Sequence, residues 1–200
     1  LKSLRRRGIR GEAIVDAMTQ LGTSTTDVDL AMSSIYANNR DLIDDETDRR
    51  FLVRDGVQLP LGGSPPDEAN PPLHPNHEDR GVREIPVSDA VLLEEGDLPG
   101  REERIWLKGL GCFQYTRDTL QYTGDDIDVV REGDVDVVHW VPASESVPVR
   151  MRTMDGDVSG RAEPGVAALE SDEMVQFERV GFARIDRHDE DETVVYYAHP

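Results

Sequence analysis

The chain has 200 residues, of which 41 are Asp or Glu and 22 are Lys or Arg, giving a net charge of -19 at pH 7. It has no run of about 18 apolar residues and no charged, apolar, small-residue leader, so we expect no membrane span and no secretion signal, and we predict a soluble protein of the cytoplasm. The single Cys112 excludes an internal disulfide and is consistent with a reducing compartment.

Acidic residues dominate, and lysine occurs only at Lys2 and Lys108. This composition resembles that of proteins from salt-loving organisms, where salt screens the repulsion between carboxylates, since the Debye length at about 1 M salt is roughly 3 Å. The net charge therefore does not exclude a polyanionic partner. It predicts weak phosphate contacts in such salt, so recognition of a nucleic acid would depend on bases and shape. The alternative is an acidic protein that never binds nucleic acid.

Residues 1–48 are predicted to be helical. An apolar stripe runs along 12–21 and stops at Gly22, a residue that commonly follows the last turn of a helix. Ser24, with an acidic residue three positions later, resembles a capping box and predicts the start of a second helix. We therefore expect a small helical unit that packs on the rest of the chain.

The only dense basic cluster of the chain lies before these helices. It consists of Arg5, Arg6 and Arg7, flanked by the apolar Leu4 and Ile9. Arginine next to an apolar anchor can contact the phosphates of a nucleic acid, but the same pattern is found at solvated helix ends. The sequence leaves both interpretations open.

From residue 49 onward short strand-like runs alternate with Gly, Pro, Asp and Asn, which predicts closed or nearly closed antiparallel β structure. The proline-rich stretch 62–75 is predicted to be a loop, and short helical turns are expected at 88–93 and 164–170. No internal repeat is evident. The predicted strands are 50–61, 81–87, 104–117, 126–131, 135–142, 147–153, 174–186 and 193–198.

Motifs of catalysis and metal binding are not found in the sequence. There is no Gly-rich phosphate loop, no Cys-x-x-Cys, no His-Glu-x-x-His and no Gly-x-Ser-x-Gly. His74 and His77 are three positions apart, but the intervening Pro75 and the lack of nearby cysteine argue against zinc. We therefore predict no catalytic residue, no metal site and no cofactor within these 200 residues.

The strand predicted over 174–186 carries the most informative polar residues. In an extended strand Gln176 and Glu178 share one face, while Val175 and Phe177 point to the other. Gln, Glu and the next residue, Arg179, offer the forked donors and acceptors that match nucleobase edges. An ordinary solvent-facing strand shows the same alternation, so this segment alone does not decide between the two interpretations.

Several segments in fixed order resemble the C-terminal part of an archaeal-type glutamyl-tRNA synthetase, a class I enzyme whose close relative is the glutaminyl enzyme. The resemblance covers nearly the whole chain, and its order and spacing make coincidence improbable. It rests on Leu4-Arg5-Arg6-Arg7-Gly8-Ile9, Ile35-Tyr36-Ala37-Asn38-Asn39-Arg40, His74-Pro75-Asn76-His77 with Gly81-Val82-Arg83, Val138-His139-Trp140-Val141-Pro142 with Val147-Pro148-Val149-Arg150, Ala162-Glu163-Pro164, and Gln176-Phe177-Glu178-Arg179-Val180-Gly181-Phe182.

The resemblance implies a mainly β protein with a short N-terminal helical segment and two antiparallel β-barrels that grip the anticodon. The helical segment would be 1–48 and the double barrel 49–200. The proximal barrel would take about 49–98 and 172–200, and the distal barrel about 102–171.

By the same resemblance, the tRNA-binding residues would be Arg49, Lys108, Gln176, Glu178 and Arg179, with Arg5, Arg6 and Arg7 on the phosphates. The stretch 100–103 is acidic where the glutaminyl enzyme is basic, and the short connection favours the glutamyl enzyme.

The expected partner is tRNA-Glu, with tRNA-Gln as an alternative, and neither DNA nor a membrane. The parent enzyme would use ATP and Mg²⁺ in a catalytic domain upstream of this chain, so the chain is expected to bind tRNA without charging it. The alternatives are a fragment of the glutaminyl enzyme, a stand-alone RNA-binding barrel and an acidic adaptor protein.

Overall fold

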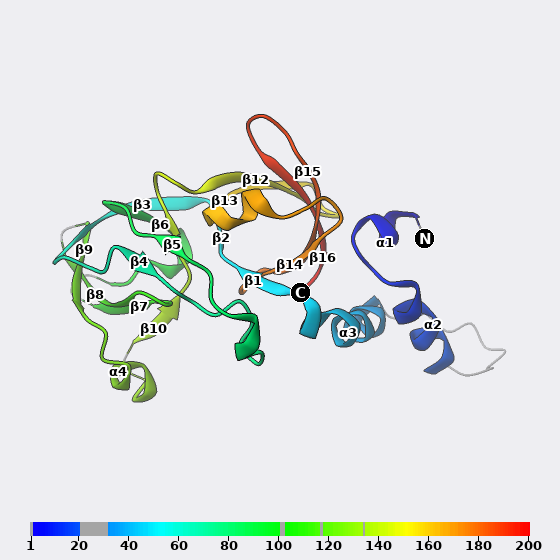
Figure 1. Ribbon diagram of the computed structural model, residues 1–200, viewed down its shortest axis with the longest axis horizontal. Helices are drawn as coiled ribbons and strands as arrows, with labels where there is room; N and C mark the ends of the chain where they lie inside the picture. Colours follow the sequence, from blue (N-terminus) through cyan, green and yellow to red (C-terminus); the bar gives the residue numbers. More distant parts are fainter. Residues whose placement is uncertain (1, 21–31, 101–102, 117, 134) are drawn as a thin grey trace.

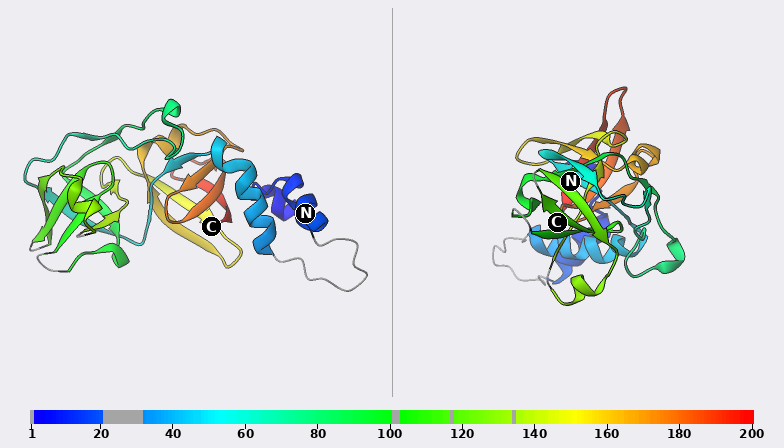
Figure 2. Two further views of the ribbon diagram at one scale, coloured as in Figure 1. Left: turned by 90° about the horizontal axis from the view of Figure 1, so that it is seen from below. Right: turned by 90° about the vertical axis from the view of Figure 1, so that its left-hand side faces the viewer.

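The computed structural model describes residues 2–20, 32–100, 103–116, 118–133 and 135–200. Three helices lie at one end of an elongated molecule, followed by two β-sheet units (Figures 1 and 2). None of the described helices is long and apolar enough to cross a membrane. The mainly β fold with short N-terminal helices confirms the predicted class. The helices are α1 (Lys2–Arg6), α2 (Gly11–Gln20) and α3 (Met32–Ile43).

The helical unit packs against the first sheet through a small apolar cluster. Ala17 of α2 and Ile35 and Ile43 of α3 are buried together with Phe182 and Ala198, which come from the sheet. Ile35 and Ile43 are eight positions apart and lie on one face of α3. The helix predicted over 12–21 is confirmed as α2, but its predicted apolar stripe is wrong, because Ala13 and Ala17 are buried whereas Val15 and Met18 are 60% exposed. The helix start predicted at residue 24 lies outside the described residues.

The first sheet has seven strands and runs in the order β1-β14-β15-β16-β12-β13-β2. Its core contains Phe177, Ile185 and Val195, all fully buried. Most neighbours are antiparallel, but β1 pairs with β14 and β12 with β16 in parallel. The strands are β1 (Asp48–Arg50), β2 (Leu52–Arg54), β12 (Val147–Arg152), β13 (Asp157–Ala162), β14 (Met174–Phe177), β15 (Gly181–His188) and β16 (Thr193–His199).

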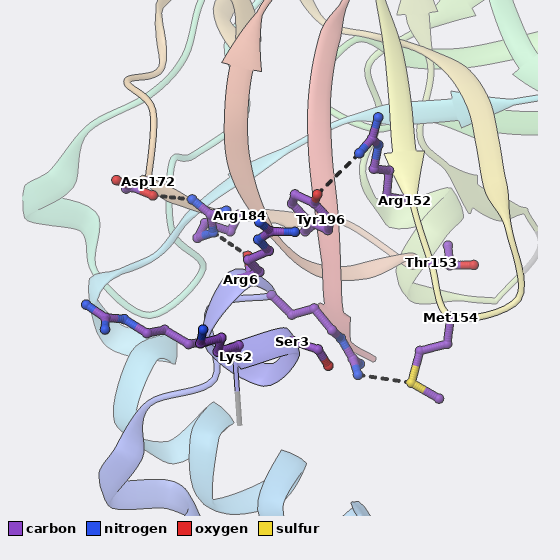
Figure 3. Close-up of a pocket in the computed structure, with 11 residues that line it drawn as sticks. Lys2, Ser3, Arg6, Arg152, Thr153, Met154, Asp172, Arg184 and Tyr196 are labelled. Atoms are coloured by element: carbon purple, nitrogen blue, oxygen red, sulfur yellow. Dashed lines mark hydrogen bonds and ion pairs between the residues drawn. The ribbon is translucent and has the colours of Figure 1, made fainter.

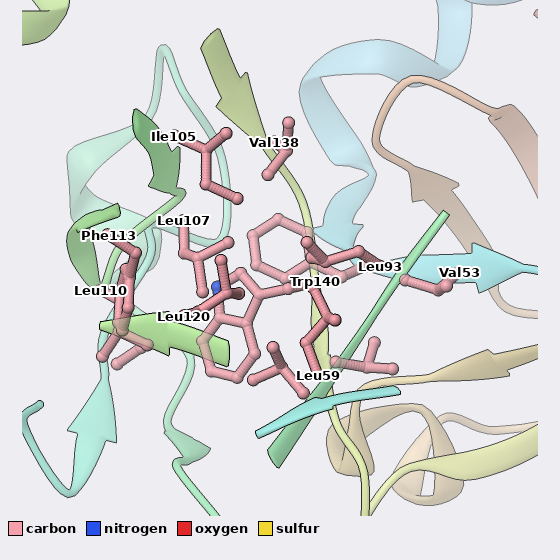
Figure 4. Packing of buried hydrophobic residues seen from close by; sticks show 14 of the residues in the cluster. Val53, Leu59, Leu93, Ile105, Leu107, Leu110, Phe113, Leu120, Val138 and Trp140 are labelled. Carbon is pink, nitrogen blue, oxygen red and sulfur yellow. The ribbon is translucent and has the colours of Figure 1, made fainter. Parts of the chain in front are cut away.

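The second sheet also has seven strands, in the order β10-β7-β8-β9-β3-β6-β11. Trp140 is fully buried at its centre, among Leu59, Leu107 and Phe113 (Figure 4). A separate ribbon pairs β4 (Glu68–Ala69) with β5 (Ile85–Pro86). The strands of the second sheet are β3 (Gly56–Gly62), β6 (Ala90–Glu94), β7 (Arg104–Leu107), β8 (Gly111–Thr116), β9 (Thr119–Gly124), β10 (Asp136–Val138) and β11 (Val141–Pro142).

Both sheets curl round on themselves. The two strands at the ends of the first sheet, β1 and β2, are consecutive pieces of one extended segment, and the same holds for β10 and β11 in the second sheet. The ends of each sheet are therefore joined by a few residues of chain, so each sheet curls into a barrel-like unit. We call the two units the first barrel and the second barrel.

The two barrels share one pairing pattern. Each has a three-stranded antiparallel meander, β14-β15-β16 or β7-β8-β9, with a parallel strand on both sides of it. The strands correspond one to one, but β1 and β2 precede the meander of the first barrel in the chain, whereas β10 and β11 follow that of the second. The second barrel is therefore a circular permutation of the first, an internal repeat that the sequence analysis does not detect.

The division of strands between barrels differs from the expected one. The chain enters the second barrel at β3 and leaves it after β11, so the strands β3 and β6 to β11 belong to it, whereas the strands over 147–162 belong to the first barrel. The segment 126–131, expected as a strand, contains the short helix α4 (Asp128–Arg131) instead. The helical turn expected at 88–93 is largely the strand β6, and the turn expected at 164–170 is confirmed by the 3-10 helix η4 (Pro164–Ala168).

Candidate nucleic-acid interface

Five residues that the sequence analysis assigns to tRNA binding lie around one small pocket between the barrels. The pocket has a volume of about 200 Å³, and two prolines of the segment that crosses over it complete its wall. Three of its side chains are basic and one is acidic, which is the reverse of the balance in the chain as a whole. The lining residues are Arg49, Lys108, Gln176, Glu178 and Arg179, together with Pro72 and Pro75.

Parallel pairing of β1 with β14 brings Arg49 beside Gln176. Arg49 is 7% exposed, and its guanidinium donates to the carbonyl oxygen of Thr47 at 2.9 Å and to Asp44 Oδ1 at 2.8 Å. Within the described residues, no hydrogen bond involves the side-chain amide of Gln176. Arg49 is thus held by its own surroundings, whereas Gln176 keeps its donors and acceptor for a ligand.

Glu178 and Arg179 lie on a turn and not within a strand, which corrects the continuous strand predicted over 174–186. β14 ends at Phe177, and the Val180 N–H donates to the Phe177 carbonyl at 3.0 Å. Arg179 has a φ of +63° and Gly181 a φ of +132°, so the chain reverses here. Val175 and Phe177 are buried, as predicted, and Gln176 is half-buried.

The second barrel presents an equivalent turn to the same pocket. The Leu110 N–H donates to the Leu107 carbonyl at 2.9 Å, and Gly109 has a φ of +77° and Gly111 a φ of +132°. Lys108 therefore corresponds to Glu178, and the two form an ion pair across the pocket. The corresponding hairpin turns of the two barrels thus meet at the candidate interface.

Arg83 supports the carboxylate of Glu178 from below, and the sequence analysis does not assign it a role. Its Nη2 lies 2.9 Å from Glu178 Oε1 and its Nε 3.0 Å from Glu163 Oε2, while its guanidinium lies over the ring of Phe51 at 4.5 Å. The Arg83 side chain is 5% exposed and that of Glu163 1%. The pocket therefore stands on a buried ion-pair network, in which removal of one partner leaves a buried charge uncompensated.

Arg179 is paired with a carboxylate of the other barrel. Its two terminal nitrogens donate to Asp97 at 2.6 and 2.7 Å. His139 lies behind this pair, fully buried, with Nε2 donating to the Leu52 carbonyl at 2.8 Å. Burial lowers the pKa of His139, so its imidazole is neutral and Nδ1 faces Arg179 as an acceptor. Asp97 and His139 are both missing from the predicted site.

The basic cluster at the N-terminus lies apart from this pocket, beside a larger groove of about 820 Å³ between α1 and the first barrel (Figure 3). Arg5 and Arg6 are exposed there, and Lys2, Arg152 and Arg184 also line the groove.

Arg7 differs from its two neighbours in the cluster, since it is 8% exposed. It donates to the Tyr197 carbonyl at 2.9 Å, to the Tyr36 hydroxyl at 3.0 Å and to the Ala198 carbonyl. Arg7 thus anchors α1 to the first barrel, and the expected phosphate contact of this residue does not fit its burial.

Asp45, His74 and His77 form a group whose possible ligand atoms lie within 4.8 Å of one another. Both ring nitrogens of His74 are occupied, however. Nε2 is 3.0 Å from the Asp44 carbonyl, and Nδ1 accepts from the Asn76 N–H at 3.1 Å. A metal ion would have to replace one of these hydrogen bonds in a fully buried ring, so the geometry favours a structural role for this group.

Comparison with known proteins identifies the fold. Two family models, both described as the anticodon-binding domain of class I tRNA synthetases (E and Q), match residues 47–132 and 137–186. The chain is 65% identical over 198 residues to a protein named glutamate–tRNA ligase from Natronomonas pharaonis, which covers 99% of the chain and 34% of that protein.

Identically named proteins show a similar pattern. The one from Haloarcula marismortui is 60% identical and that from Methanosarcina barkeri 38%, covering 99% and 100% of the chain. The chain spans about a third of the length of these relatives, 35% in both cases. With its two barrels and the matched segments that meet at their junction, the chain belongs to the anticodon-binding part of the class I tRNA synthetases for glutamate and glutamine.

Proposed function

We propose that this chain is the part of a glutamate–tRNA ligase that binds the anticodon of tRNA-Glu in the cytoplasm. The named relatives support the choice of glutamate, since proteins that are 65%, 60% and 55% identical to the chain share this name. The whole enzyme would join glutamate to tRNA with ATP and Mg²⁺. The residues of the pocket would position the tRNA for that reaction and would take no part in its chemical steps.

The observation that carries this proposal is the convergence of Arg49, Lys108, Gln176, Glu178 and Arg179 on one pocket. At about 200 Å³ it is smaller than the ~300–1,000 Å³ typical of small-molecule sites, and it suits a single unstacked base. A base edge needs donors and acceptors side by side, which the amide of Gln176 and the guanidinium of Arg179 provide.

Phosphate contacts would come from the groove beside α1. Lys2, Arg5 and Arg6 line it, and no ion pair of these three side chains is found within the described residues. In multimolar salt such contacts release few counterions and add little affinity, so the pocket would dominate selectivity. This division fits a chain with a net charge of -19, which would otherwise repel RNA.

The test is a titration of the chain with tRNA-Glu and with anticodon-substituted transcripts in multimolar KCl. We expect cognate tRNA to bind more tightly, and Arg179→Ala and Gln176→Ala each to weaken binding by about 1–3 kcal/mol, the usual contribution of one good base contact. Arg49→Ala should weaken it by a similar amount, but this variant also removes two internal hydrogen bonds, so its stability must be measured as well.

The assignment of the pocket would be refuted if binding did not depend on the anticodon, or if Arg179→Ala and Gln176→Ala both left binding unchanged. Preference for tRNA-Gln over tRNA-Glu would favour the glutaminyl enzyme. A stand-alone RNA-binding barrel would bind other structured RNAs as tightly as tRNA-Glu, and an acidic adaptor would bind no RNA at any salt concentration.

A further inference from the structure

We propose that Asp97 is a positioning residue that aims the guanidinium of Arg179 at the base-binding pocket. The two residues belong to different barrels, since Arg179 lies on the turn after β14 and Asp97 ends the 3-10 helix η3 (Glu95–Asp97) that follows β6. They form a bidentate ion pair with distances of 2.6 and 2.7 Å. This inference rests on the proposed function of the pocket.

The backbone end of Arg179 is fixed by the tight turn. The Glu178 N–H donates to the Arg50 carbonyl at 3.0 Å, and the Val180 N–H donates to the Phe177 carbonyl at 3.0 Å. Arg179 itself has a φ of +63°, a conformation that the corresponding turn of the second barrel gives to Gly109. The backbone of Arg179 is therefore strained, because this conformation favours glycine, and strained residues of this kind are concentrated at functional sites.

The far end of the side chain is fixed by Asp97. Only 11% of the Asp97 side chain is exposed, whereas that of Arg179 is 50% exposed. A free arginine would lose rotamer freedom when it bound a base, and this loss weakens binding. Because the planar guanidinium is already held by two hydrogen bonds to one carboxylate, that loss occurs during folding and not during binding.

The ion pair leaves N–H groups of Arg179 available for a ligand. A guanidinium carries five N–H donors, and the bidentate pair uses one from each terminal nitrogen. One terminal nitrogen also lies 3.4 Å from Nδ1 of the buried His139. The Nε–H and the second N–H of the other terminal nitrogen have no partner within the described residues. Arg179 can therefore contact a base without leaving Asp97.

A second ion pair between the barrels provides a matched control. Arg54 at the end of β2 and Glu94 at the end of β6 form a bidentate pair with distances of 2.8 and 3.1 Å. The side chain of Glu94 is 18% exposed, similar to Asp97, but neither residue of this pair lines the pocket. If Asp97 only tied the barrels together, loss of either carboxylate would have the same effect on RNA binding.

The experiment measures the affinity for tRNA-Glu and for an anticodon-substituted transcript in multimolar KCl, for the parent chain and four variants. These are Asp97→Asn, Arg179→Ala, the double variant and the control Glu94→Gln. We expect Asp97→Asn to reduce discrimination between the two RNAs by about tenfold, within the range of one base contact. Glu94→Gln should lower stability but leave discrimination unchanged.

The double variant decides how Asp97 acts. If Asp97 works by orienting Arg179, adding Asp97→Asn to Arg179→Ala should change discrimination less than twofold, because nothing remains to be oriented. An equal loss in both backgrounds would overturn the inference, and so would tighter cognate binding by Asp97→Asn, which would make the ion pair a competitor of the RNA. If Arg179→Ala itself leaves discrimination intact, the proposed function of the pocket fails, which is a separate and recognisable outcome.

Discussion

Gly181 sets the turn that presents Glu178 and Arg179, so its replacement by alanine tests the geometry of the candidate interface. With a φ of +132°, a Cβ at this position would lie 2.5 Å from the carbonyl oxygen of His199 and 2.9 Å from the Cα of Pro200. Both contacts are with backbone atoms, one at the end of β16 and one in the residue that follows it, and backbone atoms cannot rotate away as a side chain can. The substitution therefore combines backbone strain with a steric clash.

Comparison with a second glycine separates the cost of backbone strain from the cost of the steric clash. Gly156 has a φ of +136°, but a Cβ there would meet no atom within 4 Å. Gly156→Ala should then show backbone strain alone, about 1–3 kcal/mol, less the small gain from a stiffer unfolded chain. Gly181→Ala adds the clash, about another 1–3 kcal/mol, and the equivalent Gly111→Ala should behave in the same way.

The assay is urea unfolding of each variant in multimolar KCl. The free energy of unfolding is extrapolated to zero urea with the same dependence on urea concentration for all variants. Gly181→Ala should also reduce anticodon discrimination, because a shifted turn misplaces Arg179, whereas Gly156→Ala should not. Suppose that Gly181→Ala lowered the free energy of unfolding no more than Gly156→Ala. The turn would then not lie as close to β16 as described, and it would not hold Glu178 and Arg179 rigidly.

Three further predictions concern charge. Replacing Arg5 and Arg6 by glutamine should weaken the binding of all tRNAs about equally and reduce the dependence of that binding on salt, which filter binding at several KCl concentrations would measure. A change in anticodon preference would contradict a role in phosphate binding. Burial lowers the pKa of His139, so at acid pH the unfolded chain binds a proton that the folded chain does not. The free energy of unfolding should therefore fall as pH drops below about 6.5, by at most about 1.4 kcal/mol per pH unit for this group. In urea titrations His139→Gln should reduce this dependence on pH, and an unchanged dependence would refute its assignment to this histidine. Because the net charge is -19, the melting temperature should rise with KCl concentration, and a melting temperature independent of salt would rule out carboxylate repulsion as a determinant of stability.

The sequence predicted features that depend on local pattern. The helix over 12–21 was predicted from its apolar residues, although the small Ala13 and Ala17 form its buried face and not the predicted stripe. The burial of Val175 and Phe177 follows from alternation along one strand. Gln176, Glu178 and Arg179 were first noted for their polar side chains, and the family resemblance then added Arg49 and Lys108, which it places by motif without knowledge of the fold. Their meeting around one pocket agrees with that placement.

The features that were missed depend on partners far apart in the sequence. Asp97 is separated from Arg179 by 82 positions and Arg83 from Glu178 by 95, and no local pattern connects them. The turn at Arg179 did leave a signal, since Phe177 and Gly181 have the same spacing as Leu107 and Gly111. That short similarity is also the visible trace of the repeat, and only the pairing of the strands makes it interpretable.

The permuted order of the strands means that no single cut divides this molecule into two self-sufficient halves. Severing the chain between β9 and β10 would give two pieces with seven barrel strands each, and each piece would hold two strands whose hydrogen-bond partners lie in the other piece. Each piece would lack strands that complete its barrel until it bound the other piece, so the two pieces would assemble only as an intertwined pair. The junction where tRNA is proposed to bind would form in that same step.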